Sequence, residues 1–163
     1  DFPINFKFIG EGIKKQELIN LVQSKKLKNI KFENSLPRLK LIEEIKKASV
    51  CVVPLIDKKL FRVAIPSKIF EIMACSKPVI LGVKGEAEKI IKNNNCGIIV
   101  DPENAEKLKN AVLTYYNDKS LSKIHGENGV NYVTKYMRKE YLVSEFLLQL
   151  NNKAKYLSLN INT

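Results

Sequence analysis

The stretch Ile65–Ala74, with the sequence IPSKIFEIMA, decides how the chain folds and where it acts. Proline suits the first position of a helix, because its missing N–H would be unpaired there anyway, so a helix is predicted to begin at Pro66. The helix N-terminus is partly positive, and Lys68 in its first turn makes sense beside a bound anion. Glu71 follows Ser67 by four residues and Lys68 by three, so all three share one helical face. The alternative is an ordinary surface ion pair between Lys68 and Glu71.

Short apolar segments alternate with longer amphipathic ones on both sides of this stretch. The strand-like segments are 6–9, 29–32, 50–54, 78–81 and 97–100. The helical segments are 14–24, 37–48, 66–75, 87–94, 105–117, 121–137 and 139–152. Apolar strands that alternate with helices predict an α/β fold, in which helices cover both faces of a parallel sheet. Ligands bind such sheets beyond the carboxyl ends of the strands, so the loop at 55–65 is of particular interest.

Length and composition indicate one globular domain. The 163 residues are 45% hydrophobic and 28% charged, and no apolar run is long enough to span a bilayer. We expect this domain to cover residues 1–152 and a polar, frayed tail to cover residues 153–163. The chain begins at Asp1 and lacks a signal-peptide pattern, so we expect it to be a piece cut from a longer protein.

The net charge of +11 makes nucleic acid or an anionic membrane surface an obvious partner. However, 25 of the 28 basic residues are lysines, scattered with no run longer than two. Dispersed charge therefore explains the composition better than a specific nucleic-acid surface. Purely electrostatic binding to nucleic acid or anionic lipid stays a third hypothesis, and it predicts a steep salt dependence. The three cysteines form no metal-binding motif, which predicts free thiols, no metal site and a reducing, cytoplasmic compartment.

Seven motifs follow one another in an order that resembles a known family. They are FIGEG at 8–12, NIKF at 29–32, ASVCVVP at 48–54, PSKIFEIMA at 66–74, KPVI at 77–80, GIIV at 97–100 and DPE at 101–103. Together they resemble the C-terminal, donor-binding half of a GT-B glycosyltransferase of retaining family 4. Within that family the chain is most similar to the bacterial cell-surface polysaccharide subgroup. The resemblance covers residues 6–141 and implies a Rossmann-like domain that binds a nucleoside-diphosphate sugar and needs no other cofactor.

The resemblance also implies roles for individual residues. Glu71 would hydrogen-bond the ribose hydroxyls, and the helix start at Pro66 would face the diphosphate. The loop at 34–38 would flank the base. No catalytic residue is assigned to this chain. The predicted donor-binding residues, which include Arg62 as a hypothesis from the residues themselves, are Gly10, Gly12, Arg62, Pro66, Ser67, Lys68, Glu71, Gly85 and Glu86.

Two departures from the family pattern affect these expectations. Many members have a glutamate eight residues before the ribose-binding one, where this chain has Val63, and the adjacent Arg62 is the candidate to supply a charge. The family's first strand and its phosphate-gripping loop precede the segment that begins at Phe6. We therefore expect the sheet either to pair segment 6–9 with segment 50–54 or to receive a strand from another molecule.

The expected function is the donor-binding half of a glycosyltransferase that acts on a polysaccharide or lipid-linked acceptor. Its partners would be the nucleotide sugar and an N-terminal acceptor domain, in the same or a separate chain, without which this chain would be inactive. We also expect peripheral association with the inner face of the membrane. The alternative is a non-catalytic nucleotide-binding interaction module.

Several other residues are interpreted as structural. His125, the only histidine, is predicted to lie on the surface of a polar helix. The segment 57–59 is predicted to be a solvated loop. The apolar residues at 143–150 are expected to leave some apolar surface exposed.

Overall fold

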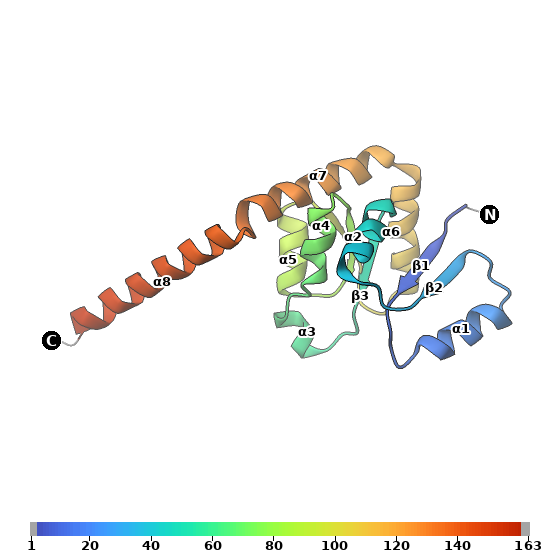
Figure 1. Ribbon diagram of the computed structural model, residues 1–163, viewed down its shortest axis with the longest axis horizontal. Helices are drawn as coiled ribbons and strands as arrows, with labels where there is room; N and C mark the ends of the chain where they lie inside the picture. Colours follow the sequence, from blue (N-terminus) through green and yellow to red (C-terminus); the bar gives the residue numbers. More distant parts are fainter. Residues whose placement is uncertain (1–2, 161–163) are drawn as a thin grey trace. The chain divides into compact units, whose positions relative to one another are not determined.

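The computed structural model describes the backbone of residues 3–160 and the side chains of residues 3–153. Strands and helices alternate through the first two thirds of the chain, and helices follow (Figure 1). The elements are β1 (Phe6–Ile9), α1 (Lys15–Ser24), β2 (Ile30–Glu33), α2 (Arg38–Lys47), β3 (Cys51–Pro54), α3 (Lys59–Val63), α4 (Lys68–Ala74), β4 (Val79–Gly82), α5 (Glu86–Asn93), β5 (Gly97–Ile99), α6 (Ala105–Asn117), α7 (Lys119–Tyr136) and α8 (Lys139–Asn160).

The predicted α/β fold with parallel strands is confirmed, and the strands form two sheets. In the unit Asp1–Glu44, β1 pairs with β2 in parallel, with Phe6 opposite Ile30. In the unit Ile45–Thr163, the strand order is β3-β4-β5, with Cys51 opposite Val79. The suggested pairing of segment 6–9 with segment 50–54 is wrong, because β1 and β3 each pair within their own unit. That residues 1–152 form one domain stays a prediction.

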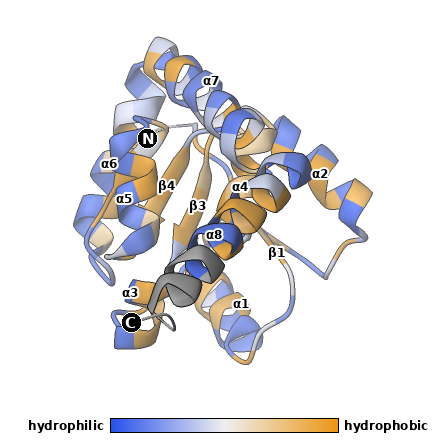
Figure 2. Ribbon diagram, turned by 90° about the vertical axis from the view of Figure 1, so that its left-hand side faces the viewer, coloured by the Kyte–Doolittle hydropathy of each residue, from blue (hydrophilic) through white to orange (hydrophobic). Residues whose placement is uncertain are grey.

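The hydrophobic core of the second unit is built around its central strand, β4, whose four residues are all buried. Helices α4 and α5 contribute Met73 and Ile91 to one cluster with Val79 and Leu81 of β4; Figure 1 shows the positions of both helices. Ile80 points to the opposite face and is also buried, and α6 packs against β4 as well. Hydrophobic residues accordingly dominate β3 and β4 in Figure 2. Both faces of β4 are therefore covered.

Three differences from the predicted helices stand out, beside shifts of one or two residues at other boundaries. Helix α4 begins at Lys68 rather than Pro66, because the carbonyl of Pro66 accepts a hydrogen bond from the Ile69 N–H at 3.1 Å, which makes a tighter turn before the helix. Helix α3 lies inside the segment predicted as a loop. Helix α8 continues to Asn160, so the tail predicted to fray is helical as far as the described residues extend. No glycine or proline follows Lys139 to end it.

The exposed apolar surface expected near the C-terminus is confirmed on α8. Phe146 is 61% exposed, and Leu147 and Leu148 are each more than half exposed. Among the described residues, no helix is both long enough and apolar enough to cross a membrane.

The prediction that His125 lies on the surface is wrong. His125 is only 4% exposed, and its Nδ1 is hydrogen-bonded to the Tyr115 hydroxyl at 2.7 Å. The polar neighbours Lys123 and Glu127, which suggested a surface position, are exposed on another face of α7. The same helix packs closely through Gly126 and Gly129, which are buried together with His125. Burial lowers the pKa of His125.

This burial predicts a pH dependence of stability. Because the folded state depresses the pKa of His125, the unfolded chain binds more protons once the pH falls below about 6.5. The stability contributed by the neutral imidazole is present above the unfolded pKa and is lost as the pH falls toward the folded pKa. We therefore expect the melting temperature to fall between about pH 7 and about pH 5, and to fall less in His125→Gln. Equal slopes in thermal unfolding of the two proteins would contradict this prediction.

Candidate functional site

The carboxyl ends of β3, β4 and β5 meet at one edge of the second unit's sheet, since the three strands are parallel. The segments that leave this edge contain α3 and the starts of α4 and α5. Six of the predicted donor-binding residues in this unit belong to these segments: Arg62, Pro66, Ser67, Lys68, Gly85 and Glu86. The sheet therefore places them on the edge where open α/β sheets bind ligands.

The structure brings Arg62 and Gly85 into direct contact through the backbone. Gly85 has φ of +102°, and a Cβ built on it would lie 1.9 Å from the carbonyl oxygen of Arg62. No side chain other than hydrogen fits this approach. The contact fixes the end of α3 against the start of α5, and so fixes the spacing of two of the loops at the carboxyl edge.

The guanidinium of Arg62 is held by Asp57. Its Nε donates to Oδ1 at 3.0 Å, and its Nη2 lies 2.9 Å from each carboxylate oxygen of Asp57. The Asp57 N–H in turn donates to Glu103 Oε2 at 3.4 Å. Asp57 belongs to the segment that sequence reasoning set aside as solvated, and it is exposed, but its carboxylate orients Arg62. This bidentate pair compensates much of the positive charge that Arg62 would offer to a bound nucleotide sugar.

A second charged group at this edge escaped the sequence reasoning. Asp101 lies between two lysines: Lys84 Nζ is 3.3 Å from its Oδ1, and Lys107 is hydrogen-bonded to its Oδ2. The hydrogen bond from Lys107, followed by that from Lys84, lowers the pKa of Asp101. Lys84 and Asp101 each stand two residues beyond the end of a strand. That position was the signal that could have identified them.

The start of α4 has the properties expected of an anion-binding turn. Among the described residues, none accepts a hydrogen bond from the backbone N–H of Ser67 or Lys68, and both side chains are exposed. The Ser67 side chain does not cap the helix. The alternative explanation, an ion pair between Lys68 and Glu71, is not formed in the described part of the chain. Glu71 is half-buried one turn further along.

The start of α5 differs from the start of α4, because carboxylates of α5 itself lie in its first turn. The Gly85 N–H donates to Glu88 Oε2 at 3.2 Å, and Glu86 pairs with Lys89 at 2.7 Å. Acidic groups in a first turn offset the positive end of the helix dipole. A phosphate group near Gly85 and Glu86 would therefore meet a more negative surface than a phosphate group near Lys68.

Gly10 and Gly12 belong to the first unit, where they form the loop after β1. Gly10 has φ of +132°, and its N–H donates to the Glu33 carbonyl at 3.2 Å. A Cβ on either glycine would meet open space. Lys15 Nζ contacts Asn34 Oδ1 at 2.7 Å, so the loops after β1 and β2 are joined. These loops correspond to the predicted glycine and base-flanking segments of the site.

Two hollows in the second unit lie away from the predicted donor-binding residues. One, of 310 Å³, is lined by Ser49, Ser76, Lys77, Pro78, Lys119, Ser122 and Lys123. The other, of 260 Å³, is lined by Asn94, Asn128, Asn131, Tyr132, Lys135 and Tyr136. Within residues 3–153, whose side chains the structure describes, no three histidine, cysteine, aspartate or glutamate side chains gather as a metal site requires.

Solved structures of glycosyltransferases share this fold. A sucrose-phosphate synthase from Thermosynechococcus elongatus matches 94% of this chain with a TM-score of 0.72 and 23% identity, over 38% of its own length. Anabaena Alr3699/HepE, solved with UDP-glucose, matches 91% of this chain with a TM-score of 0.76 and 16% identity, over 41% of its own length. At these identities the likeness concerns the fold alone.

Sequence comparison identifies the family. The uncharacterized glycosyltransferase MJ1178 of Methanocaldococcus jannaschii is 31% identical over 136 residues, which are 83% of this chain and 37% of that protein. The chain thus spans less than half the length of this curated relative. Residues 2–132 match the family described as glycosyl transferases group 1. This match covers most of the chain, including the carboxyl edge described above, and the chain belongs to the group 1 glycosyl transferases.

Proposed function

We propose that this chain is the donor-binding half of a glycosyltransferase that moves a sugar from a nucleoside-diphosphate sugar to a polysaccharide or lipid-linked acceptor in cell-surface glycan biosynthesis. The observation on which this rests is the family match over residues 2–132. Anabaena Alr3699/HepE, which shares the fold, was solved with UDP-glucose, and WaaG is named as a glycosyltransferase involved in lipopolysaccharide biosynthesis. An acceptor domain, in the same or another chain, would complete the enzyme, which would work at the inner face of the membrane.

The start of α4 is the proposed place for the diphosphate. The N–H groups of Ser67 and Lys68 have no acceptor among the described residues, so they are available to phosphate oxygens. The exposed ammonium of Lys68 stands beside them. When the sugar leaves, negative charge develops on the nucleoside diphosphate. Fixed N–H donors and a cation at that point stabilise the leaving group without rearrangement.

Glu71 is the proposed partner of the ribose. A carboxylate accepts two hydrogen bonds at once, which matches the two adjacent hydroxyls of a ribose. The separation of one helical turn between Lys68 and Glu71 suits a nucleotide that lies along the helix start, with the diphosphate at one end and the ribose at the other. Gly10 and Gly12 are proposed to allow the nucleotide a close approach to their backbones. Gly85 and Glu86 are proposed as a helix-start loop near the donor.

The pairing of Arg62 with Asp57 makes Arg62 a weaker candidate for contact with the donor sugar. Its bidentate pair with Asp57 leaves Nη1 as the part of the guanidinium not used in that pair. Val63, where many relatives have a sugar-contacting glutamate, is 71% exposed and offers no polar atom beyond its backbone. We therefore propose that recognition of the donor sugar depends on residues outside α3.

Calorimetric titration with UDP, GDP and ADP tests this function. We expect one of the three to bind, and Lys68→Gln to weaken its binding about tenfold, since a hydrogen bond to a charged group contributes roughly 1.5–3 kcal/mol. Lys92→Gln is the matched control, because Lys92 is an exposed lysine at the other end of α5. It should bind as the wild type does. Absence of binding to all three diphosphates, or equal losses in both variants, would refute the proposed site.

A further inference from the structure

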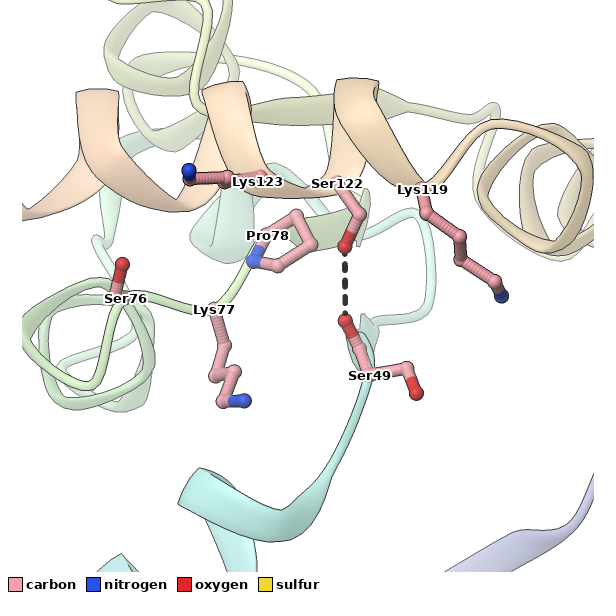
Figure 3. A pocket seen from close by; sticks show the side chains of 7 residues that line it. All are labelled: Ser49, Ser76, Lys77, Pro78, Lys119, Ser122 and Lys123. Atoms are coloured by element: carbon pink, nitrogen blue, oxygen red, sulfur yellow. Dashed lines mark hydrogen bonds between the residues drawn. The ribbon is translucent and has the colours of Figure 1, made fainter.

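The 310 Å³ hollow lies at the edge of the sheet opposite the proposed donor site. Ser49 stands two residues before β3, and Lys77 and Pro78 directly precede β4, so the hollow is at the amino ends of these parallel strands. Its other wall is the beginning of α7, which supplies Lys119, Ser122 and Lys123. Figure 3 shows the lysine side chains arranged around the hydrogen bond between Ser122 and Ser49. The hollow therefore lies at the other end of the sheet from the proposed donor site, which is at the carboxyl ends of the strands.

The lining of this hollow is basic and contains no carboxylate. Three ammonium groups and three hydroxyls are its side-chain polar groups. In the described part of the chain, Lys77 has no carboxylate within ion-pair distance. Lys119 donates to the Tyr115 carbonyl at 3.3 Å, and Lys123 has only Glu127, at 3.8 Å and exposed. Because so little negative charge compensates these three ammonium groups, the hollow would attract an anion.

The backbone beneath the lysines is held firmly. Ser122 Oγ donates to the Ser49 carbonyl at 3.2 Å, which ties α7 to the segment before β3. A Cβ on Gly126 would lie 2.3 Å from the Ser76 carbonyl oxygen, so α7 also packs directly on the turn before β4. Ser76 itself has φ of +56°, the conformation of a tight turn. Three segments distant in the sequence thus form one fixed floor.

The lysine side chains extend from this floor on flexible stems. In Figure 3 their ammonium ends point apart. Each lysine has a flexible four-carbon stem that can swing a compact charge toward a ligand. The N-terminal end of α7 adds a positive potential, although Asp118 caps that end by accepting from the Leu121 N–H at 2.9 Å. Asp118 is not among the residues that line the hollow.

We propose that this hollow binds a phosphate group, as a second anion site independent of the donor edge. Serine hydroxyls and lysine ammoniums are donors that phosphate oxygens accept, and the volume leaves room for the group that bears the phosphate. The phosphate belongs either to a small soluble ester or to an anionic lipid headgroup. Both present the same chemistry to the three lysines, and the experiment distinguishes them.

The test uses amide NMR of the whole chain, titrated with inorganic phosphate at constant ionic strength. We expect saturable shifts at Ser76, Lys77 and Ser122. The variant Lys77→Gln/Lys119→Gln/Lys123→Gln should weaken this binding about tenfold or more, because charge-assisted hydrogen bonds are lost. The control Lys46→Gln/Lys92→Gln/Lys109→Gln removes the same charge from exposed helix surfaces elsewhere. It should weaken phosphate binding by about twofold at most, through the general field alone.

Sedimentation with phosphatidylcholine vesicles, with and without phosphatidylglycerol, distinguishes the two sources. If the wild type and the control bind phosphatidylglycerol vesicles while the Lys77/Lys119/Lys123 triple variant does not, this result assigns the site to a lipid headgroup. Shifts with free phosphate and no such vesicle binding assign it to a soluble ester. Equal losses in both triple variants, or shifts confined to Ser67 and Lys68, would overturn the site. Neither result depends on the proposed donor function.

Discussion

Gly85→Ala is expected to destabilise the chain by about 3–5 kcal/mol, because it combines a strained backbone with an overlap that no side chain can relieve. The new methyl group would lie 1.9 Å from the Arg62 carbonyl oxygen and within 2.8 Å of its Cα. Both atoms belong to the backbone, so α3 as a whole must move away from α5. The φ of +102° adds to the cost, since residues with a Cβ rarely adopt it.

Thermal and urea unfolding followed by circular dichroism measure this effect. Gly82→Ala is the matched control, because Gly82 lies at the same edge and a Cβ there would have only ordinary contacts, the nearest at 3.5 Å from Pro54 Cα. We expect the control to change stability by less than about 1 kcal/mol. If Gly85→Ala unfolds at the same urea concentration as the control, α3 is not fixed by this contact and the carboxyl edge is more adaptable than the structure indicates.

The fold could be predicted from the sequence because its signals are local. Apolar segments of four or five residues between amphipathic ones identified the five strands of the described residues. The family's order of motifs added a predicted position for the donor site. The interval 66–71 was predicted for the same reason, since a proline, a lysine and a glutamate at helical spacing are visible without knowledge of tertiary contacts.

The errors concern features that tertiary contacts determine. His125 has polar neighbours in the sequence, but the face of α7 that contains it is turned inward by the close approach of Gly126 to Ser76. Asp57 is exposed as predicted, but its pairing with Arg62 was not foreseen, because α3 brings Arg62 to it. The hollow of three lysines joins residues from three separate segments. Sequence spacing contains no signal for such contacts.

Glu71→Gln is expected to weaken nucleoside-diphosphate binding by about 10- to 100-fold, equivalent to roughly 1.5–3 kcal/mol for hydrogen bonds to a charged acceptor. Glutamine has the same shape, but only its amide oxygen accepts a hydrogen bond, and its NH₂ group would face a hydroxyl as a donor. Glu106→Gln, an exposed glutamate of α6 paired with Lys109, is the matched control and should bind as the wild type does. Thermal unfolding of both variants shows whether any loss of binding comes from loss of folded protein.

The decisive comparison pairs this substitution with a change in the ligand. If Glu71 accepts hydrogen bonds from the ribose, a 2′-deoxynucleoside diphosphate makes one hydrogen bond fewer to Glu71 in the wild type. The affinity lost on removing that hydroxyl should therefore be much smaller in Glu71→Gln than in the wild type, and the two changes should not add. Additive losses would mean that the carboxylate acts on the nucleotide only through the long-range field. In that case α4 would position the diphosphate, and the ribose partner would have to be sought among the other loops at the carboxyl ends of the strands.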